Sequence, residues 1–125
     1  MVRTYKELEV FKRAVELAMA IFELSKRFPA EERYSLTDQL RRSSRSVCAN
    51  IGEAWRKRRY KPAFISKLSD FETEAAETQV WIEIARRCHY VTAEEASYLD
   101  EECDHVMAQL ISMIEGADKW IIRKK

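Results

Sequence analysis

Apolar residues recur at alternating intervals of three and four along most of the chain, which places them on one face of an α-helix. The clearest series spans residues 96–120, and a second one spans 64–85. Helix-spaced series also run from Leu36 to Ala54 and through Phe11, Val15, Ala18 and Phe22. Four such seams joined by short loops are typical of a bundle of antiparallel helices.

The helix boundaries follow from capping residues and prolines. Three hydroxyl residues precede an acidic residue by three positions, the pattern of a capping box: Thr4 with Glu7, Ser35 with Asp38, and Thr92 with Glu95. Pro62 suits the first turn of a helix, and Pro29 ends the helix before it. We therefore expect helices over about 5–28, 35–59, 62–89 and 93–121.

The composition narrows the fold class. Two glycines in 125 residues exclude a phosphate-binding loop and a dinucleotide fingerprint, because both need clustered glycines. The scarcity of turn-forming residues argues against a fold of many strands. The prediction is an all-α protein, an antiparallel up-down four-helix bundle that forms a single domain over residues 1–125.

Charge is distributed unevenly. Residues 1–61 hold 15 Lys and Arg against 8 Asp and Glu, whereas residues 62–125 hold 7 against 13. The basic excess is concentrated in 33–61, where nine basic residues face only Asp38 and Glu53. This distribution fits either a surface that binds a polyanion or basic helices that pack beside acidic ones.

A basic stripe is expected along the second predicted helix. At 100° per residue, one sector contains Arg41, Arg45, Arg56 and Arg59, spread over about 27 Å. Cys48 and Gly52 share this sector and add little bulk between the arginines. The candidate nucleic-acid-binding residues are Arg41, Arg42, Arg45, Arg56, Lys57, Arg58, Arg59 and Lys61.

Two interpretations of this stripe stay open. Fixed cations suit a phosphate backbone, and Tyr60 or Trp55 offers a ring on which a base can stack. The alternative is a solvated face, or one paired with acidic residues of a neighbouring subunit. The third predicted helix offers such acids: Asp70, Glu72, Glu74, Glu77 and Glu83.

Apolar residues outside the seams favour self-association. Ile65, Trp81, Ile84 and Cys88 form a second stripe on the third predicted helix, and we interpret them as an oligomer interface. A shoulder of the monomer core explains them equally well.

The sequence shows no pattern typical of a catalytic or metal centre. Ser43, Ser46 and Asn50 lie near the seam, with Glu53 and Gln79 as expected partners, but no histidine is tied to them. The chain has one Glu-x-x-His motif, 102–105, where a di-metal bundle needs two. We expect no catalytic residue, no metal and no other cofactor, and no small-molecule substrate is evident.

Cysteine use and hydropathy indicate the compartment. Three cysteines without a CxxC pair indicate reduced thiols, and no stretch is apolar over the length of a bilayer. The expected location is the cytoplasm, with no membrane partner.

Several segments resemble the bacterial family of 23S rRNA intervening-sequence proteins. The most specific is 35–54 (SLTDQLRRSSRSVCANIGEA), and 5–11, 77–79 and 88–91 also resemble that family. The resemblance implies a four-helix bundle that assembles as a homopentamer. Most members of that family have no assigned biochemical role, and the resemblance implies no catalytic residue. A more distant resemblance is to the accessory subunit of diversity-generating retroelements, which binds nucleic acid and a reverse transcriptase.

The function predicted from the sequence is therefore non-enzymatic. It is an oligomeric bundle that binds structured RNA or DNA through the stripe on the second helix. The alternative is an interaction or scaffolding module that binds a protein partner on its apolar faces.

Overall fold

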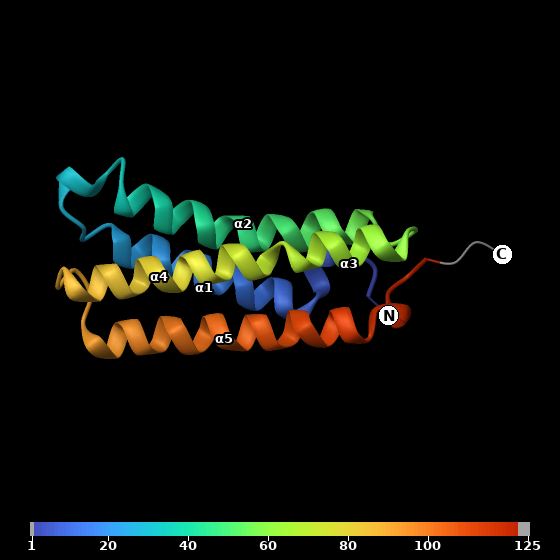
Figure 1. Ribbon diagram of the computed structural model, residues 1–125. Coiled ribbons are helices and arrows are strands. Elements are labelled where there is room, and N and C mark those ends of the chain that lie inside the picture. Colours follow the sequence, from blue (N-terminus) through green and yellow to red (C-terminus); the bar gives the residue numbers. More distant parts are fainter. Residues whose placement is uncertain (1, 123–125) are drawn as a thin grey trace.

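The computed structural model describes residues 2–122, which form four antiparallel rods packed side by side (Figure 1). The α-helices are α1 (Glu9–Ser25), α2 (Leu36–Arg56), α3 (Lys61–Ser69), α4 (Phe71–Arg87) and α5 (Ala93–Glu115). Short 3₁₀ turns occupy Tyr5–Glu7, Ala30–Glu32 and Ala117–Lys119. Helices α3 and α4 run almost in line and together make the third rod, so the predicted all-α, up-down four-helix bundle is confirmed.

The rods form a closed circuit around one core. α2 packs against α1 and α4, and α5 packs against the same two helices from the other side. Both ends of the described chain lie at one end of the bundle, where α2 ends and α3 begins (Figure 1). No helix within residues 2–122 is long and apolar enough to cross a bilayer.

Three of the four predicted seams supply the core as expected. Phe64, Phe71 and Ile82 from the third rod and Leu99 and Leu110 from α5 are almost completely buried. Of the seam predicted for the first helix, only Ala18 is buried, and the rest is wrong by about one position, because α1 also buries Val10, Ala14, Leu17 and Ile21.

The two aromatic residues of that first seam cover the flanks of α1. The ring of Phe11 meets the ring of Tyr5 edge-on with centroids 4.9 Å apart. Phe22 lies beneath basic side chains of α2. Large rings at the sides of the inner face of a helix bury apolar surface without lying in the core. Because these rings are as apolar as core residues, the sequence prediction placed them in the seam.

Three predicted helices are shorter than expected. The first, expected over about 5–28, covers only Glu9–Ser25 as an α-helix. α2 ends at Arg56 rather than near 59, because Arg58 Nε donates to the carbonyl of Trp55 at 2.8 Å and ends the ladder of helical hydrogen bonds. The last helix ends before Gly116 rather than near 121. Glycine favours this end because it carries the largest entropic cost of helix formation among ordinary residues.

The third predicted helix is interrupted rather than continuous. Asp70 separates α3 from α4, and Ser69 Oγ donates to the carbonyl of Ile65 at 2.7 Å. A hydroxyl that bonds back to the preceding turn competes with the backbone and bends a helix.

The three predicted capping boxes fared differently. Thr92 and Glu95 form the expected reciprocal box at the start of α5. Thr4 caps only a 3₁₀ turn, through the amide of Lys6. At α2 the prediction is wrong, because the hydroxyl of Ser35 and the amide of Leu36 both donate to Glu32, which precedes the helix.

Ser43, one of the polar residues inside α2, has a partner other than those expected. Thr78 Oγ1 donates to Ser43 Oγ at 2.9 Å across the α2–α4 interface, and both residues are buried. The expected partners bond elsewhere: Glu53 pairs with Lys67, and Gln79 donates to Asp104. A buried hydroxyl pair that satisfies itself fixes the register of two helices and carries no catalytic group.

The Gly52→Ala variant should be more stable than the parent by about 0.5–1 kcal/mol. Gly52 lies inside α2, and a Cβ built there meets the ring of Tyr5 at 3.7 Å, an ordinary van der Waals distance. Urea unfolding measures the change, and Ala49→Gly, an exposed position of the same helix, should lose a similar amount. A less stable Gly52→Ala protein would mean that Tyr5 tolerates no methyl group beneath it.

Candidate nucleic-acid interface

The first half of the basic stripe lies against α1. The guanidinium of Arg41 is 4.8 Å from the centroid of the Phe22 ring, and that of Arg45 is 5.7 Å from it. Arg41 Nε also donates to Ser25 Oγ at 2.8 Å. Neither guanidinium pairs with a carboxylate among residues 2–122. Both cations are therefore positioned by an aromatic ring and keep an uncompensated charge.

The N-terminal segment crosses the middle of the stripe, which corrects the expectation of little bulk there. The ring of Tyr5 covers Gly52, and Tyr5 and Phe11 form one wall of a shallow groove along Cys48 and Ala49. The small size of Gly52 makes room for Tyr5 rather than for a ligand. The stripe is thus divided into two basic patches, one at Arg41 and Arg45 and one at the end of α2.

The second patch lies where α2 ends. Arg56, Lys57 and Arg59 are exposed, and none of them forms an ion pair with another described residue. Because the helix stops at Arg56, Arg59 leaves the helical line and lies in the turn that leads to α3. The patch is a cluster at the end of the bundle rather than a straight extension of the stripe.

Arg58 has a structural role within this patch. Its guanidinium lies over the ring of Trp55, 3.4 Å from the centroid, and burial lowers its pKa from the ordinary value. Trp55 is buried beneath it and packs against Trp120, so Trp55 is not free to stack a base as the sequence prediction allowed. Tyr60, 67% exposed, remains available for stacking.

Two other predicted site residues are neutralised within the chain. Lys61 Nζ lies 2.9 Å from a carboxylate oxygen of Asp118, and Arg42 pairs with Asp38 at 3.7 Å one turn earlier in α2. Both pairs are exposed and therefore weak. They nevertheless make these two residues poorer candidates than Arg56, Lys57 and Arg59.

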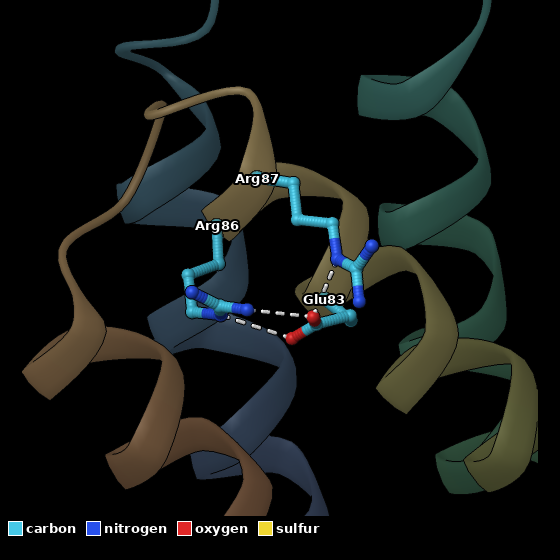
Figure 2. Close-up of polar contacts among 3 residues, drawn as sticks. All are labelled: Glu83, Arg86 and Arg87. Atoms are coloured by element: carbon cyan, nitrogen blue, oxygen red, sulfur yellow. Dashed lines mark hydrogen bonds and ion pairs between the residues drawn. The ribbon is translucent and has the colours of Figure 1, made fainter.

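The arginines of α4 show what a compensated cation looks like in this protein. Figure 2 shows Glu83 between Arg86 and Arg87: Arg86 donates through Nε and Nη2 at 3.0 and 2.7 Å, and Arg87 through Nε at 2.8 Å. These cations lie in the last turn of α4, where they also favour the helix dipole. The exposed cations at the end of α2, by contrast, have no carboxylate partner in the described chain.

The carboxyl of Glu83 should titrate far below the usual range, at a pKa of about 2. The hydrogen bonds from Arg86 come first among the causes, followed by those from Arg87. Because the folded pKa is lowered, the stabilisation is complete above the unfolded pKa near 4.3 and is lost as the pH falls toward 2. Carbon-13 NMR of the carboxyl measures this. Arg86→Gln should raise the pKa, whereas an ordinary midpoint in the parent protein would contradict the pairing.

Acidic residues remain available on the outer side of α4. Glu72, Glu74 and Glu77 form no ion pair with another described residue, whereas Glu83 and Asp70 do. Burial, together with the charges of Glu77 and Asp70, raises the pKa of Glu74. These carboxylates are available to pair with the basic stripe of a neighbouring subunit. The alternative interpretation of the stripe therefore stays open.

An exposed apolar row runs along the same helix. Ile84 and Cys88, the residue directly after α4, are exposed, and Val80, which the sequence analysis missed, lies one turn before Ile84 with 54% of its surface exposed. The other two predicted interface residues, Ile65 and Trp81, are half-buried and pack against the core. Val80, Ile84 and Cys88 are four positions apart, a spacing that the sequence shows. The sequence analysis instead grouped Trp81 with Ile84 and Cys88.

The cysteines and acidic residues form no reactive centre in the described chain. All three cysteines are free thiols. Burial raises the pKa of Cys48 to about 11 and that of Cys103 to about 12, so neither is a ready nucleophile. Within residues 2–122, no three His, Cys, Asp or Glu side chains converge on a point that a metal ion can occupy.

Comparison with known proteins agrees with the motifs in α2. Residues 6–112 match the model of a family described as 23S rRNA-intervening sequence protein. The chain is also similar to the solved structure of a protein of unknown function from the S23 ribosomal protein family of Bacteroides thetaiotaomicron. That match has a TM-score of 0.75 and 32% sequence identity, and it covers 84% of this chain and 97% of the other. No curated protein matches the chain.

Proposed function

Because this chain belongs to the 23S rRNA-intervening sequence protein family, we propose that it is a non-enzymatic, oligomeric protein that binds structured RNA or DNA. The binding surface consists of the two basic patches of α2 and the turn after it. The phosphate backbone is the group recognised, since phosphates demand fixed cations and little else.

One observation carries the proposal: the arginines of these patches lack carboxylate partners, whereas five arginines elsewhere in the described chain or beside the patches have one. Five arginines on α1, α2, α4 and the loop after α1 lie within ion-pair distance of a carboxylate: Arg13, Arg27, Arg42, Arg86 and Arg87. Arg41, Arg45, Arg56 and Arg59 do not. Uncompensated cations on one side of a protein repel one another, and a polyanion relieves that repulsion.

Assembly would strengthen such binding. Each subunit supplies few phosphate contacts, so a single copy binds weakly. A ring of copies, the homopentamer implied by the family resemblance, repeats the patches and raises the apparent affinity through multivalency. The apolar row of Val80 and Ile84 on α4 and Cys88 directly after it is the proposed contact between subunits.

The first test is a salt titration of binding. A fluorescent RNA hairpin and a DNA duplex of the same length are titrated with the purified protein at several salt concentrations. The proposal expects the logarithm of affinity to fall linearly with the logarithm of salt concentration, because bound cations release counterions. No binding of either probe at low salt would contradict it.

A second candidate function rests on the apolar row of α4. Exposed Val80 and Ile84 beside an acidic surface also fit a protein partner with a basic, apolar face. If the protein is such an interaction module, a partner protein should bind to it, and the substitution Ile84→Glu should abolish that binding. This function also predicts that nucleic acid does not bind.

A further inference from the structure

A pocket of about 390 Å³ opens at the end of the bundle where the N-terminal segment meets the end of α2. Four arginines line it: Arg3, Arg56, Arg58 and Arg59. None of its lining residues carries a carboxylate, and none of the four arginines forms an ion pair with another residue of the described chain. Its volume suits a small ligand rather than a protein segment.

Arg58 forms a rigid part of this pocket. Stacking on Trp55 and the hydrogen bond from Nε to the Trp55 carbonyl hold the guanidinium in place. Its terminal nitrogens make no other hydrogen bond to a described residue, so they remain free to donate. A donor held in position before binding loses little entropy when a ligand arrives.

The backbone around the pocket adds little negative charge. A helix ends in carbonyls that oppose an anion, but four carbonyls at and after the end of α2 already accept hydrogen bonds. Arg58 Nε satisfies the carbonyl of Trp55, and the amide of Lys57 satisfies that of Ala54. The carbonyls of Lys57 and Arg58 accept from the amides of Tyr60 and Ile122. The guanidinium groups therefore dominate the potential inside the pocket.

We propose that this pocket binds a phosphate monoester, the terminal phosphate of a nucleic acid or of a free nucleotide. A monoester carries up to two negative charges and three terminal oxygens, which matches several guanidinium forks better than the single charge of a phosphodiester. The end of a nucleic-acid strand also fits into a small pocket, whereas the internal phosphates of a continuous strand do not. The inference rests on the proposed function, because the pocket continues the second basic patch of α2.

The experiment compares three versions of one internally labelled RNA: with a 5′-phosphate, with a 3′-phosphate, and with hydroxyls at both ends. The parent protein should bind at least one phosphorylated version about tenfold more tightly, as expected for one or two charged hydrogen bonds. The double variant Arg3→Gln/Arg59→Gln should lose that preference. Arg59 belongs to the second basic patch, but Arg3 lies outside α2, so loss of the preference for a terminal phosphate reports on the pocket that the two residues share.

The matched control removes the same charge elsewhere. Arg33→Gln/Arg45→Gln changes two exposed arginines that lack carboxylates and lie away from the pocket. This control should weaken all three RNAs alike and keep the preference. Circular dichroism confirms that each variant folds.

The outcomes separate the two proposals. Equal, salt-dependent binding of all three RNAs excludes an RNA end as the ligand and leaves the nucleic-acid proposal standing, whereas binding of no RNA overturns the nucleic-acid proposal. In either case an NMR titration with adenosine monophosphate against adenosine decides the pocket. Shifts at Arg3 and Trp55 with the nucleotide alone support a free nucleotide as the ligand, and their absence overturns the pocket.

Discussion

Replacing Arg56, Lys57 and Arg59 with glutamine should lower nucleic-acid affinity by about a hundredfold at 0.15 M salt. Each phosphate contact contributes about 0.9 to the slope of log affinity against log salt, so three lost contacts reduce the slope by about 2.7. The three residues are exposed and form no ion pair within the described chain, so the fold should remain intact. Arg58 is left unchanged because it packs on Trp55.

A control variant separates location from total charge. Lys12→Gln/Lys26→Gln/Arg33→Gln removes the same charge from exposed positions on other elements. It should change the slope far less. Equal affinity of the α2 variant and the parent protein would show that the end of α2 is not the site. A change in its oligomeric state would show instead that these cations pair with Glu72, Glu74 and Glu77 of a neighbouring subunit.

Ile84→Glu should dissociate the proposed oligomer into monomers at micromolar concentration. Ile84 lies in the middle of the exposed row on α4, and 40% of its surface is exposed in the single chain. A buried interface residue at the centre of a contact contributes about 2 kcal/mol or more, and a carboxylate there adds the cost of desolvation. In a ring the change is repeated at every contact. Light scattering coupled to size-exclusion chromatography measures the mass.

The matched control for this variant is Ile111→Glu. Ile111 is 44% exposed and lies on α5, so the substitution has the same chemistry and a similar cost to the monomer. An oligomer that survives Ile84→Glu but not Ile111→Glu would move the interface to α5. A parent protein that is monomeric at high concentration would remove assembly, and with it multivalency, from the proposed function.

The sequence predicts the bundle well because helix formation and burial are governed by local spacing. Apolar residues three and four apart define the inner face of a helix wherever that helix is placed, and the seams of α2, α4 and α5 were correct for this reason. Thr92 and Glu95 were recognised because a capping box joins residues only three apart. The seam of α1 was misplaced, because Phe11 and Phe22 are as apolar as core residues but are only half-buried, beside the core.

The candidate site depended on contacts between residues far apart in the chain. The sequence identified the cations of α2 but not that Tyr5 covers Gly52, that Phe22 underlies Arg41, or that Arg58 shields Trp55. It also did not bring Arg3 to the end of α2, where the pocket forms.

The helices, most of their inner faces and the excess of basic charge on α2 can thus be predicted from the amino-acid sequence, since each follows from residues within a turn or two of one another. Which cations keep their charge uncompensated depends on how the helices and loops pack. Arg42 and Lys61 have partners, whereas Arg56 and Arg59 have none in the described chain. The physical reason is that an ion pair acts over a few ångströms, and packing of distant segments sets which side chains come that close.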